Sequence, residues 1–382
     1  MMATGVVSVQ EAATAVDLRV IAFLFSMFVV TTGLPLSGDL NRLTSWIVSH
    51  SSTPRRLIIL TSFGFGSAAA LLMNDTLALM GTPILIAAAK RLDIKAKPLL
   101  LTLAFSVTAG SAMTPIGNPQ NMLIAVQGGV ATPFLSFLYY LLPSTILNLG
   151  ITAAMVMLVY RKDLGRSLAP FGAPDAAKDS TLSKLSVGAL TLAVGGILVV
   201  NILSLFGVNT DITISEVALA AATLLLLASS RRNEIMANVD WSVLVMFAGL
   251  FVFTKGVYNG GIVGLAMPYL SSLAGIGLLL FIVVSSVILS QVVSNVPLVT
   301  LFLPFYAQVI PPAMPVYWAA FAGASTLAGN VTLLGAASNL IIVEQAEKAG
   351  ERIGFTEFAL IGIPLSVACL GVLFGTLLPH TL

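Results

Sequence analysis

The stretch "SAMTPIGNPQNMLIA", residues 111–125, decides the fold because it places helix-breaking residues and amides inside an otherwise apolar segment. Backbone at membrane depth tolerates free N–H and C=O groups only where it lines a cavity or packs against protein. The stretch therefore predicts a membrane helix that is broken near its centre, with backbone groups free to bind a ligand. The residues that indicate the break are Thr114, Pro115, Gly117, Asn118, Pro119, Gln120 and Asn121.

The composition predicts a polytopic helical membrane protein. Of 382 residues, 57% are hydrophobic and 9% are charged, and apolar segments of roughly 17 to 27 residues recur, enough to cross a bilayer core of about 30 Å. The net charge of +2 gives no indication of a nucleic-acid partner, and Cys369, the single cysteine, has no intrachain disulfide partner. Two histidines are too few to suggest a metal site. We expect a multi-pass protein of the cell inner membrane that has no cofactor beyond a coupling ion.

Two apolar stretches, 57–89 and 276–312, are interrupted near their centres and are predicted to be hairpins. Basic residues flank the first stretch on both sides, and because positive charge stays in the cytoplasm, both of its ends lie on that face. It is therefore a re-entrant hairpin with its tip at Asn74, Asp75 and Thr76. Full crossings are expected at 18–34, 98–126, 134–160, 186–208, 213–230, 241–256, 316–343 and 356–378.

This threading places nearly all basic residues in the cytoplasm. Of the 18 lysines and arginines, only Arg19 and Lys255 fall outside, and the N-terminus lies outside with them. Five crossings separate the two hairpins, so the second hairpin enters from the external face.

An internal repeat supports this opposed arrangement. The repeated residues keep their order and nearly constant offsets, which chance is unlikely to supply. Because an odd number of crossings separates the matched hairpins, the repeat is inverted. The matches are Asp17 and Gly33 with Asp240 and Gly256, 223 residues apart; Asn74 and Pro83 with Asn295 and Pro304, 221 apart; Thr114, Gly117 and Asn121 with Thr332, Gly335 and Asn339, 218 apart; and Phe137 and Pro143 with Phe358 and Pro364, 221 apart.

We therefore predict an all-α polytopic fold built as an inverted repeat with two re-entrant hairpins and two broken helices, 98–126 and 316–343. Residues 1–160 form the first repeat, 161–185 a cytoplasmic linker and 186–382 the second repeat. Two crossings precede "VDWSV" in the second repeat and none precedes "VDLRV" in the first. Either the reading frame begins late or the protein is a reduced member of its class.

The hairpin tips and the breaks are expected to converge near the membrane midplane. A half-helix beginning near Pro119 aims N–H groups at the break, which suits an anion, and carbonyls released before it suit Na⁺. We expect substrate contacts from Asn74, Thr76, Asn118, Gln120, Asn121, Ser294, Asn295, Ser338 and Asn339. Ion coupling is expected at Asp75, Thr114, Gly117, Thr332 and Gly335, with Na⁺ held among Asn74, Asp75, Gly117, Asn295 and Gly335.

At these residues the chain resembles the ion transporter superfamily, which holds divalent-anion/sodium symporters, citrate transporters, arsenite pumps and certain sodium/proton antiporters. It is most similar to short bacterial anion-permease-like members, over roughly residues 16–378. The symporters carry Ser-Asn-Thr at the hairpin tips; here the tips read Asn74-Asp75-Thr76 and Ser294-Asn295-Val296, so only Thr76, Ser294 and Asn295 carry over directly. The resemblance implies a scaffold domain that often dimerises, a mobile transport domain and elevator-type alternating access.

Asp75 is the only acid predicted deep within the membrane. A buried carboxylate without a partner is costly, so it takes up a proton or lies beside a cation. The alternative is that Asp75 caps the returning half-helix. Each of the other polar features also has a structural alternative. Asn74 and Asn295 can hold helices together without binding a ligand, and the Gly-Asn-Pro-Gln-Asn break can be a kink whose free backbone groups bond to neighbouring helices. Lys255 can extend toward the membrane interface rather than bind substrate.

We expect a secondary active transporter, not an enzyme, which moves a small anion or oxyanion coupled to Na⁺ or H⁺. A carboxylate, an arsenite-like species or another inorganic anion fits the amides and helix N-termini. The alternative is a sodium/proton antiporter that uses Asp75 as the exchanging carboxylate. An intramembrane aspartyl protease would need two facing deep acids, and a channel would need a continuous polar path rather than one midplane cluster.

Overall fold

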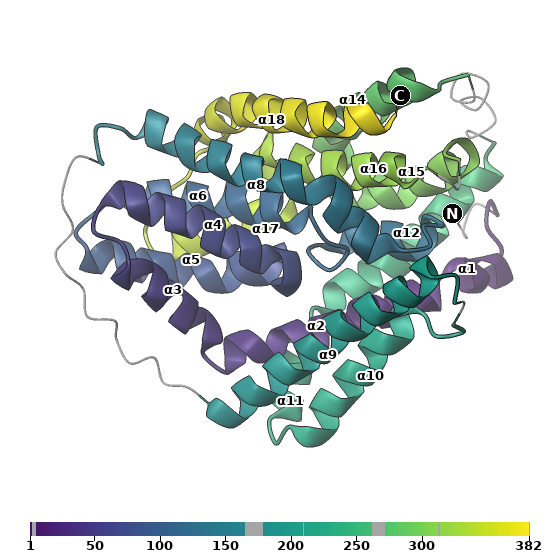
Figure 1. The fold of residues 1–382 in the computed structure, drawn as a ribbon, viewed down its shortest axis with the longest axis horizontal. Helices are drawn as coiled ribbons and strands as arrows, with labels where there is room; N and C mark the ends of the chain where they lie inside the picture. The colour runs from purple at the N-terminus through teal and green to yellow at the C-terminus, as the bar shows by residue number, and fades with distance from the viewer. Residues whose placement is uncertain (2–4, 165–178, 209, 262–271, 312–313, 382) are drawn as a thin grey trace.

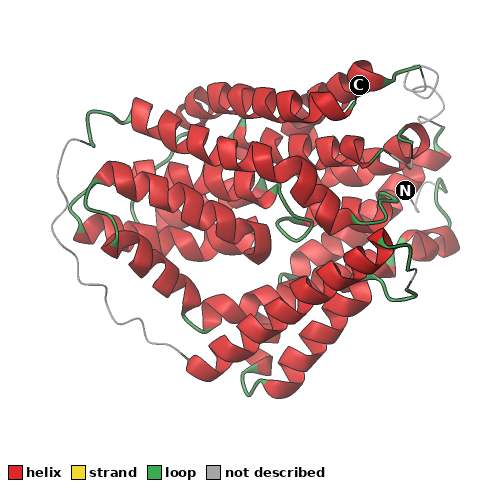
Figure 2. Ribbon diagram, viewed as in Figure 1, coloured by secondary structure: helices red, strands yellow, loops and turns green. Residues whose placement is uncertain are grey.

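The computed structural model describes residue 1 and residues 5–164, 179–208, 210–261, 272–311 and 314–381. Within these residues the chain is helical, with no strand (Figures 1 and 2). The all-α fold expected from the sequence is confirmed. The helices are α1 (Val9–Ala15), α2 (Leu18–Leu36), α3 (Asp39–Ser49), α4 (Pro54–Leu72), α5 (Asn74–Arg91), α6 (Lys97–Ser111), α7 (Pro119–Gln127), α8 (Pro133–Val159), α9 (Ser180–Leu205), α10 (Ile214–Ala228), α11 (Arg232–Ala237), α12 (Trp241–Asn259), α14 (Gly275–Val293), α15 (Asn295–Val309), α16 (Pro315–Leu327), α17 (Ala337–Lys348) and α18 (Phe355–Leu377).

The described residues contain seven helices that are long and apolar enough to cross a membrane. Five of them, α2, α8, α9, α12 and α18, coincide with predicted crossings, and the other two, α4 and α14, are the first limbs of the hairpins. The remaining predicted crossings are the two broken helices, whose halves are short, and α10, which has 15 residues.

The two hairpins turn at matched residues. Met73 joins α4 to α5 and has φ 62°, and Ser294 joins α14 to α15 and has φ 66°. A positive φ is unfavourable for residues other than glycine, yet it occurs at both tips, 221 residues apart. In each case a buried asparagine, Asn74 or Asn295, begins the returning helix. The tip geometry therefore repeats along with the sequence.

The first limb of the hairpin ends level with the first break. Helices α4 and α6 run parallel, because their contacts keep an offset of 44 residues: Ser106 Oγ donates to Ser62 Oγ over 2.9 Å, and Thr114 Oγ1 donates to the carbonyl of Ala70. The helices approach so closely that a Cβ on Gly110 would lie 1.9 Å from a backbone oxygen of α4. The hairpin tip is thus placed at the depth of the break, and not beyond it.

The helices form two groups that each draw on both halves of the chain. Helices α2, α9, α10 and α11 pack together in the lower part of Figure 1. With α12, which contacts α2 and matches it in the repeat, they make the group that we call the outer unit. The hairpins, the broken helices, α8 and α18 make the second group, the hairpin unit. Asp17 and Asp240, matched in sequence, are the N-caps of α2 and α12.

Three short helices, α1, α3 and α11, lie outside every element predicted from the sequence. Helix α3 is amphipathic, with Leu40 and Ile47 buried and Trp46 half exposed. With 11 residues it is about 16 Å long, too short to cross a membrane. It connects α2 of the outer unit to α4 of the hairpin unit.

Candidate functional site

Four helix N-termini of the hairpin unit converge on a cavity of about 130 Å³, which Met246 of α12 borders from the outer unit. They are the starts of the two returning hairpin limbs, α5 and α15, and of the two second half-helices, α7 and α17. Each N-terminus carries partial positive charge and N–H groups with no partner in their own helix. The lining residues are Asn74, Asp75, Pro119, Gln120, Met246, Ser294, Asn295, Val296, Pro297, Ala336 and Ala337.

The first hairpin tip is fastened to both breaks. The backbone N–H of Asn74 donates to the carbonyl of Gly117 over 3.0 Å, and its side-chain amide lies 3.4 Å from Ser338 Oγ. The Asn74 Oδ1 atom accepts the N–H of Asp75 over 3.0 Å. Asn74 therefore joins the two repeats through these contacts.

The first break is held by buried amides that bond to its own backbone. Asn118 is the N-cap of α7 and accepts the N–H of Asn121 over 2.9 Å. The amide nitrogen of Asn121 lies 3.2 Å from three carbonyls, of Ser111, Ala112 and Thr114, and its oxygen accepts from Thr326. Asn118 and Asn121 have no exposed surface. They brace the break rather than line the cavity.

The second break repeats this brace only in part. The amide nitrogen of Asn339 donates to the carbonyls of Gly329 and Thr332 over 2.7 and 3.3 Å, which are the counterparts of Ser111 and Thr114 at the same offset of 218. Its oxygen, however, has no partner within the described residues. The position matching Asn118 is Ala336, so α17 begins without a side-chain cap.

Close backbone approach explains the matched glycines of the breaks. A Cβ on Gly117 would lie 2.2 Å from the carbonyl oxygen of Ser111, and one on Gly335 would lie 2.9 Å from the backbone of Gly329. Any side chain would push these segments apart. Thr114 adds a further link by accepting the N–H groups of Ile116 and Gly117 over 3.2 Å. Thr114, Gly117, Thr332 and Gly335 thus shape the breaks.

Among the residues that the structure describes, Asp75 is the only ionisable one that lines the central cavity. Its carboxylate forms no hydrogen bond or ion pair within the described part of the chain, and it does not cap α5. It also lines a second cavity of about 150 Å³, between the two units, together with Thr76 and Asp240. The described residues contain no cluster of three or more His, Cys, Asp or Glu side chains that could hold a metal ion. Asp75 thus lies where the two cavities adjoin.

The residues predicted from the sequence fall into three places. Asn74, Asp75, Gln120, Ser294 and Asn295 line the central cavity, and Thr76 lines only the second one. Asn118, Asn121, Ser338 and Asn339 are buried in the walls.

Sequence reasoning missed two residues that support the site. Gln291, one turn before the second tip, donates to the carbonyl of Ala328 and accepts from Thr332, both over 2.9 Å. Thr326 bonds to the amides of the first break. Gln291 could have been found from the sequence, because it is a polar residue isolated in an apolar segment just before the second tip.

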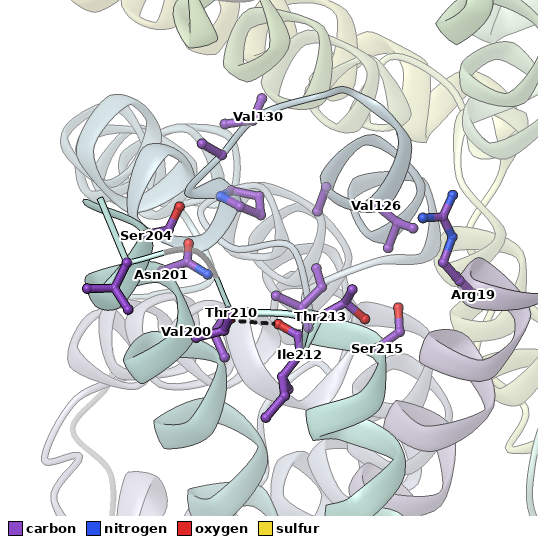
Figure 3. Close-up of a pocket in the computed structure, with 15 residues that line it drawn as sticks. Arg19, Val126, Val130, Val200, Asn201, Ser204, Thr210, Ile212, Thr213 and Ser215 are labelled. Carbon is purple, nitrogen blue, oxygen red and sulfur yellow. Dashed lines mark hydrogen bonds between the residues drawn. The ribbon is translucent and has the colours of Figure 1, made fainter. Parts of the chain in front are cut away.

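A separate cavity of about 240 Å³ is lined by residues of α2, α7, α9 and α10 and of the segments beside them, among them Arg19, Val126, Asn201 and Ser215 (Figure 3). It contains no hairpin tip and none of the predicted site residues. Asn201 in its wall accepts the backbone N–H groups of Phe134 and Leu135 over 3.0 and 3.4 Å. It therefore marks a junction between α9 of the outer unit and α8 of the hairpin unit.

Comparison with known proteins identifies this architecture. Residues 1–327 match the model of the citrate transporter family. The chain belongs to this family. The resemblance to the ion transporter superfamily is therefore confirmed, and the protein is a multi-pass membrane transporter and not an enzyme.

Its relatives are also described as transporters or membrane proteins. The chain is 29% identical to the silicon efflux transporter LSI3 of Oryza sativa, covering 97% of this chain and 89% of the relative. It is 26% identical to a 46 kDa membrane protein of Mycobacterium leprae (93% and 84% covered) and 23% identical to a putative transporter arsB of Dictyostelium discoideum (96% and 83% covered). The crystal structure of the Alcanivorax borkumensis YdaH transporter has the same fold, with a TM-score of 0.62, 13% identity and 94% and 84% coverage.

Proposed function

We propose that the protein is a secondary active transporter that binds a small anion or oxyacid in the central cavity and couples its movement to H⁺ or Na⁺ through Asp75. The observation that carries this proposal is the convergence of four helix N-termini on a cavity that contains one carboxylate. The helix N-termini favour a negative charge in the cavity, whereas the carboxylate of Asp75 favours a positive one. Coupling between the substrate anion and a cation or proton follows from this combination.

The N-termini favour a negative or oxygen-rich substrate. Each is equivalent to roughly half a positive charge, and its N–H groups bond to oxygen atoms. Helices α15 and α17 begin without a side-chain cap, in contrast to α7, whereas the first two N–H groups of α5 donate to the carbonyl of Gly117 and to Asn74 Oδ1. Uncapped N–H groups for a substrate are thus offered by the starts of α15 and α17.

An ionised Asp75 would repel such a substrate. Because the carboxylate has no cationic partner among the described residues, it is neutralised by a proton or by a bound cation when the anion enters. Substrate and coupling ion then bind together, which is the requirement for symport. Na⁺ would draw on oxygen atoms at the tips and breaks, among them Asn74, Gly117, Asn295 and Gly335.

The relatives support an oxyacid as one substrate class. The rice protein is named a silicon efflux transporter and the Dictyostelium protein a putative transporter arsB. A carboxylate is the other class, since the family description is a citrate transporter. We propose that the hairpin unit carries the site across the membrane against the outer unit, as in an elevator, and that the protein works as a homodimer in the inner membrane.

The test begins with a thermal-shift panel of citrate, phosphate, sulfate, arsenite and silicic acid, each with and without Na⁺, because a ligand that binds only the folded state raises its stability. Asp75→Asn is then compared with wild type in proteoliposomes. We expect the variant to exchange substrate but to lose accumulation against a gradient, together with the pH or Na⁺ dependence of uptake. Asp93→Asn, an exposed acid just beyond the other end of α5, is the matched control.

Unaltered gradient-driven uptake by Asp75→Asn would refute coupling through this carboxylate. The unpaired carboxylate also favours a second function, sodium/proton antiport. That function predicts Na⁺-driven proton movement in wild-type liposomes that contain no anionic substrate, and its complete loss in Asp75→Asn.

A further inference from the structure

The inverted repeat contains two pairs of polar residues that match in sequence, each made of an aspartate from the outer unit and a glutamine from the hairpin unit. Asp17 and Gln127 belong to the first repeat. At the repeat offsets of 223 and 218 residues, their counterparts are Asp240 and Gln345. Each aspartate is the N-cap of an outer-unit helix, and each glutamine lies on the second half of a broken helix in the hairpin unit.

Only the first pair is bonded. Gln127 Nε2 donates to Asp17 Oδ2 over 2.9 Å, while Asp17 Oδ1 caps α2 by accepting from Arg19 and Val20. Asp240 uses Oδ1 in the same way, accepting from Val243 over 3.2 Å. Within the described part of the chain, neither Asp240 Oδ2 nor the side-chain amide of Gln345 has a hydrogen bond.

The contacts between the two units also differ between the bonded and the unbonded pair. Among the described residues, the units are joined near the bonded pair by Asn201, which accepts from the start of α8 and lines a cavity with Arg19 and Ala125. Thr254 of α12 also donates to the carbonyl of Thr300 of α15 over 3.5 Å. The unbonded end instead holds the 150 Å³ cavity, lined by α2, α5, Asn238, Asp240 and Ile341 of α17. That cavity reaches Asp75.

We infer that the two pairs are alternating latches, of which the structure shows one closed and one open. In the state described, Asp17 and Gln127 close the end near the termini and the site communicates with the end of Asp240. In the opposite state Asp240 binds Gln345, the cavity beside Asp75 closes, and the bond between Asp17 and Gln127 breaks. This inference rests on the proposed alternating access and adds the residues that hold each state.

The experiment measures which end is open, without any substrate. The Asn238→Cys substitution places a reporter thiol in the cavity wall, and the single native cysteine, Cys369, is buried. Removing a hydrogen bond to a charged group from one of two states shifts their ratio by roughly tenfold or more. We expect Gln127→Leu to slow labelling of the reporter by a membrane-impermeant maleimide and Gln345→Leu to leave it as fast as in the parent or faster.

Gln308→Leu is the control, because the Gln308 amide bonds only to its own helix. The latch inference would be refuted if Gln127→Leu and Gln345→Leu changed the labelling rate in the same direction, or if Gln127→Leu left the labelling rate unchanged.

Cross-linking separates this inference from the proposed function. One variant carries cysteines at positions 17 and 127, and a second variant carries cysteines at positions 240 and 345. A bifunctional thiol reagent of side-chain length joins the two cysteines of each variant. We expect both pairs to cross-link, and each cross-link to block transport of a substrate found in the ligand panel. Transport without any cross-link at the second pair would refute the latch alone. No cross-link at the second pair, no shift in labelling and no transport of any ligand would refute the proposed function as well.

Discussion

Replacing Asn121 by alanine should destabilise the protein more than the matched replacement of Asn339. The Asn121 amide nitrogen contacts three carbonyls and its oxygen accepts from Thr326, whereas Asn339 donates to two carbonyls and its oxygen is unpaired. An amide has two N–H groups, so we count three bonds for Asn121 and two for Asn339. At about 1 kcal/mol for each bond inside a membrane protein, Asn121→Ala costs about 3 kcal/mol and Asn339→Ala about 2 kcal/mol.

The measurement is denaturant unfolding of the purified protein in mild detergent, followed by tryptophan fluorescence. Asn121→Asp is an informative companion, because it keeps the size of the side chain but removes both donors and turns an oxygen toward three carbonyls. We expect it to be less stable than Asn121→Ala. Wild-type stability of Asn121→Ala, together with a loss of ligand binding, would show that Asn121 is a ligand contact and not a brace.

Other expected outcomes follow from the tips, the helix packing and the surface charges. Ser294→Gly keeps the positive φ but removes the steric cost of a side chain there, and thermal unfolding should show a gain of about 1 kcal/mol. Gly110→Ala should abolish folded expression, because its Cβ would lie 1.9 Å from a carbonyl of α4, whereas Gly150→Ala, with nothing within 4 Å, should express normally. Arg231 donates to Glu234 and holds the pKa of that carboxyl below its usual 4.5. The stabilisation is therefore present at neutral pH and lost as the pH falls through the lowered pKa, and Glu234→Gln should flatten the acid limb of stability against pH.

The sequence predicted the hairpins, the breaks and the repeat well, because each depends on a residue that does not otherwise belong in an apolar helix. Pro115, Gly117 and Pro119 lie within five residues of one another, and such a cluster of helix breakers interrupts a helix where a single one need not, so the first break was found within a few residues of its observed position. Helix α3 was not predicted, since its amphipathic pattern is short and polar and resembles that of a loop.

The roles of the buried amides could not be predicted in the same way. An asparagine at a break serves equally as a brace or as a ligand contact, and only the packing distinguishes Asn121, which is enclosed, from Asn74, which reaches the cavity. The match between Gln127 and Gln345 is visible in the sequence, but its meaning depends on knowing that one of the two is bonded.

The absence of a side-chain cap at Ala336 has a consequence for how the two halves of this protein can change over time. In the first repeat Asn118 is committed to holding α7, so substitutions there disrupt the architecture. At Ala336 no such duty exists, and the backbone of α17 begins beside the cavity with its N–H groups uncapped. The first break is therefore fixed by its architecture, whereas the second break can tolerate substitution. A search for altered substrate preference, whether by selection in the laboratory or by comparing natural transporters, should find its changes at residues 336–338 and not at Asn118 or Asn121.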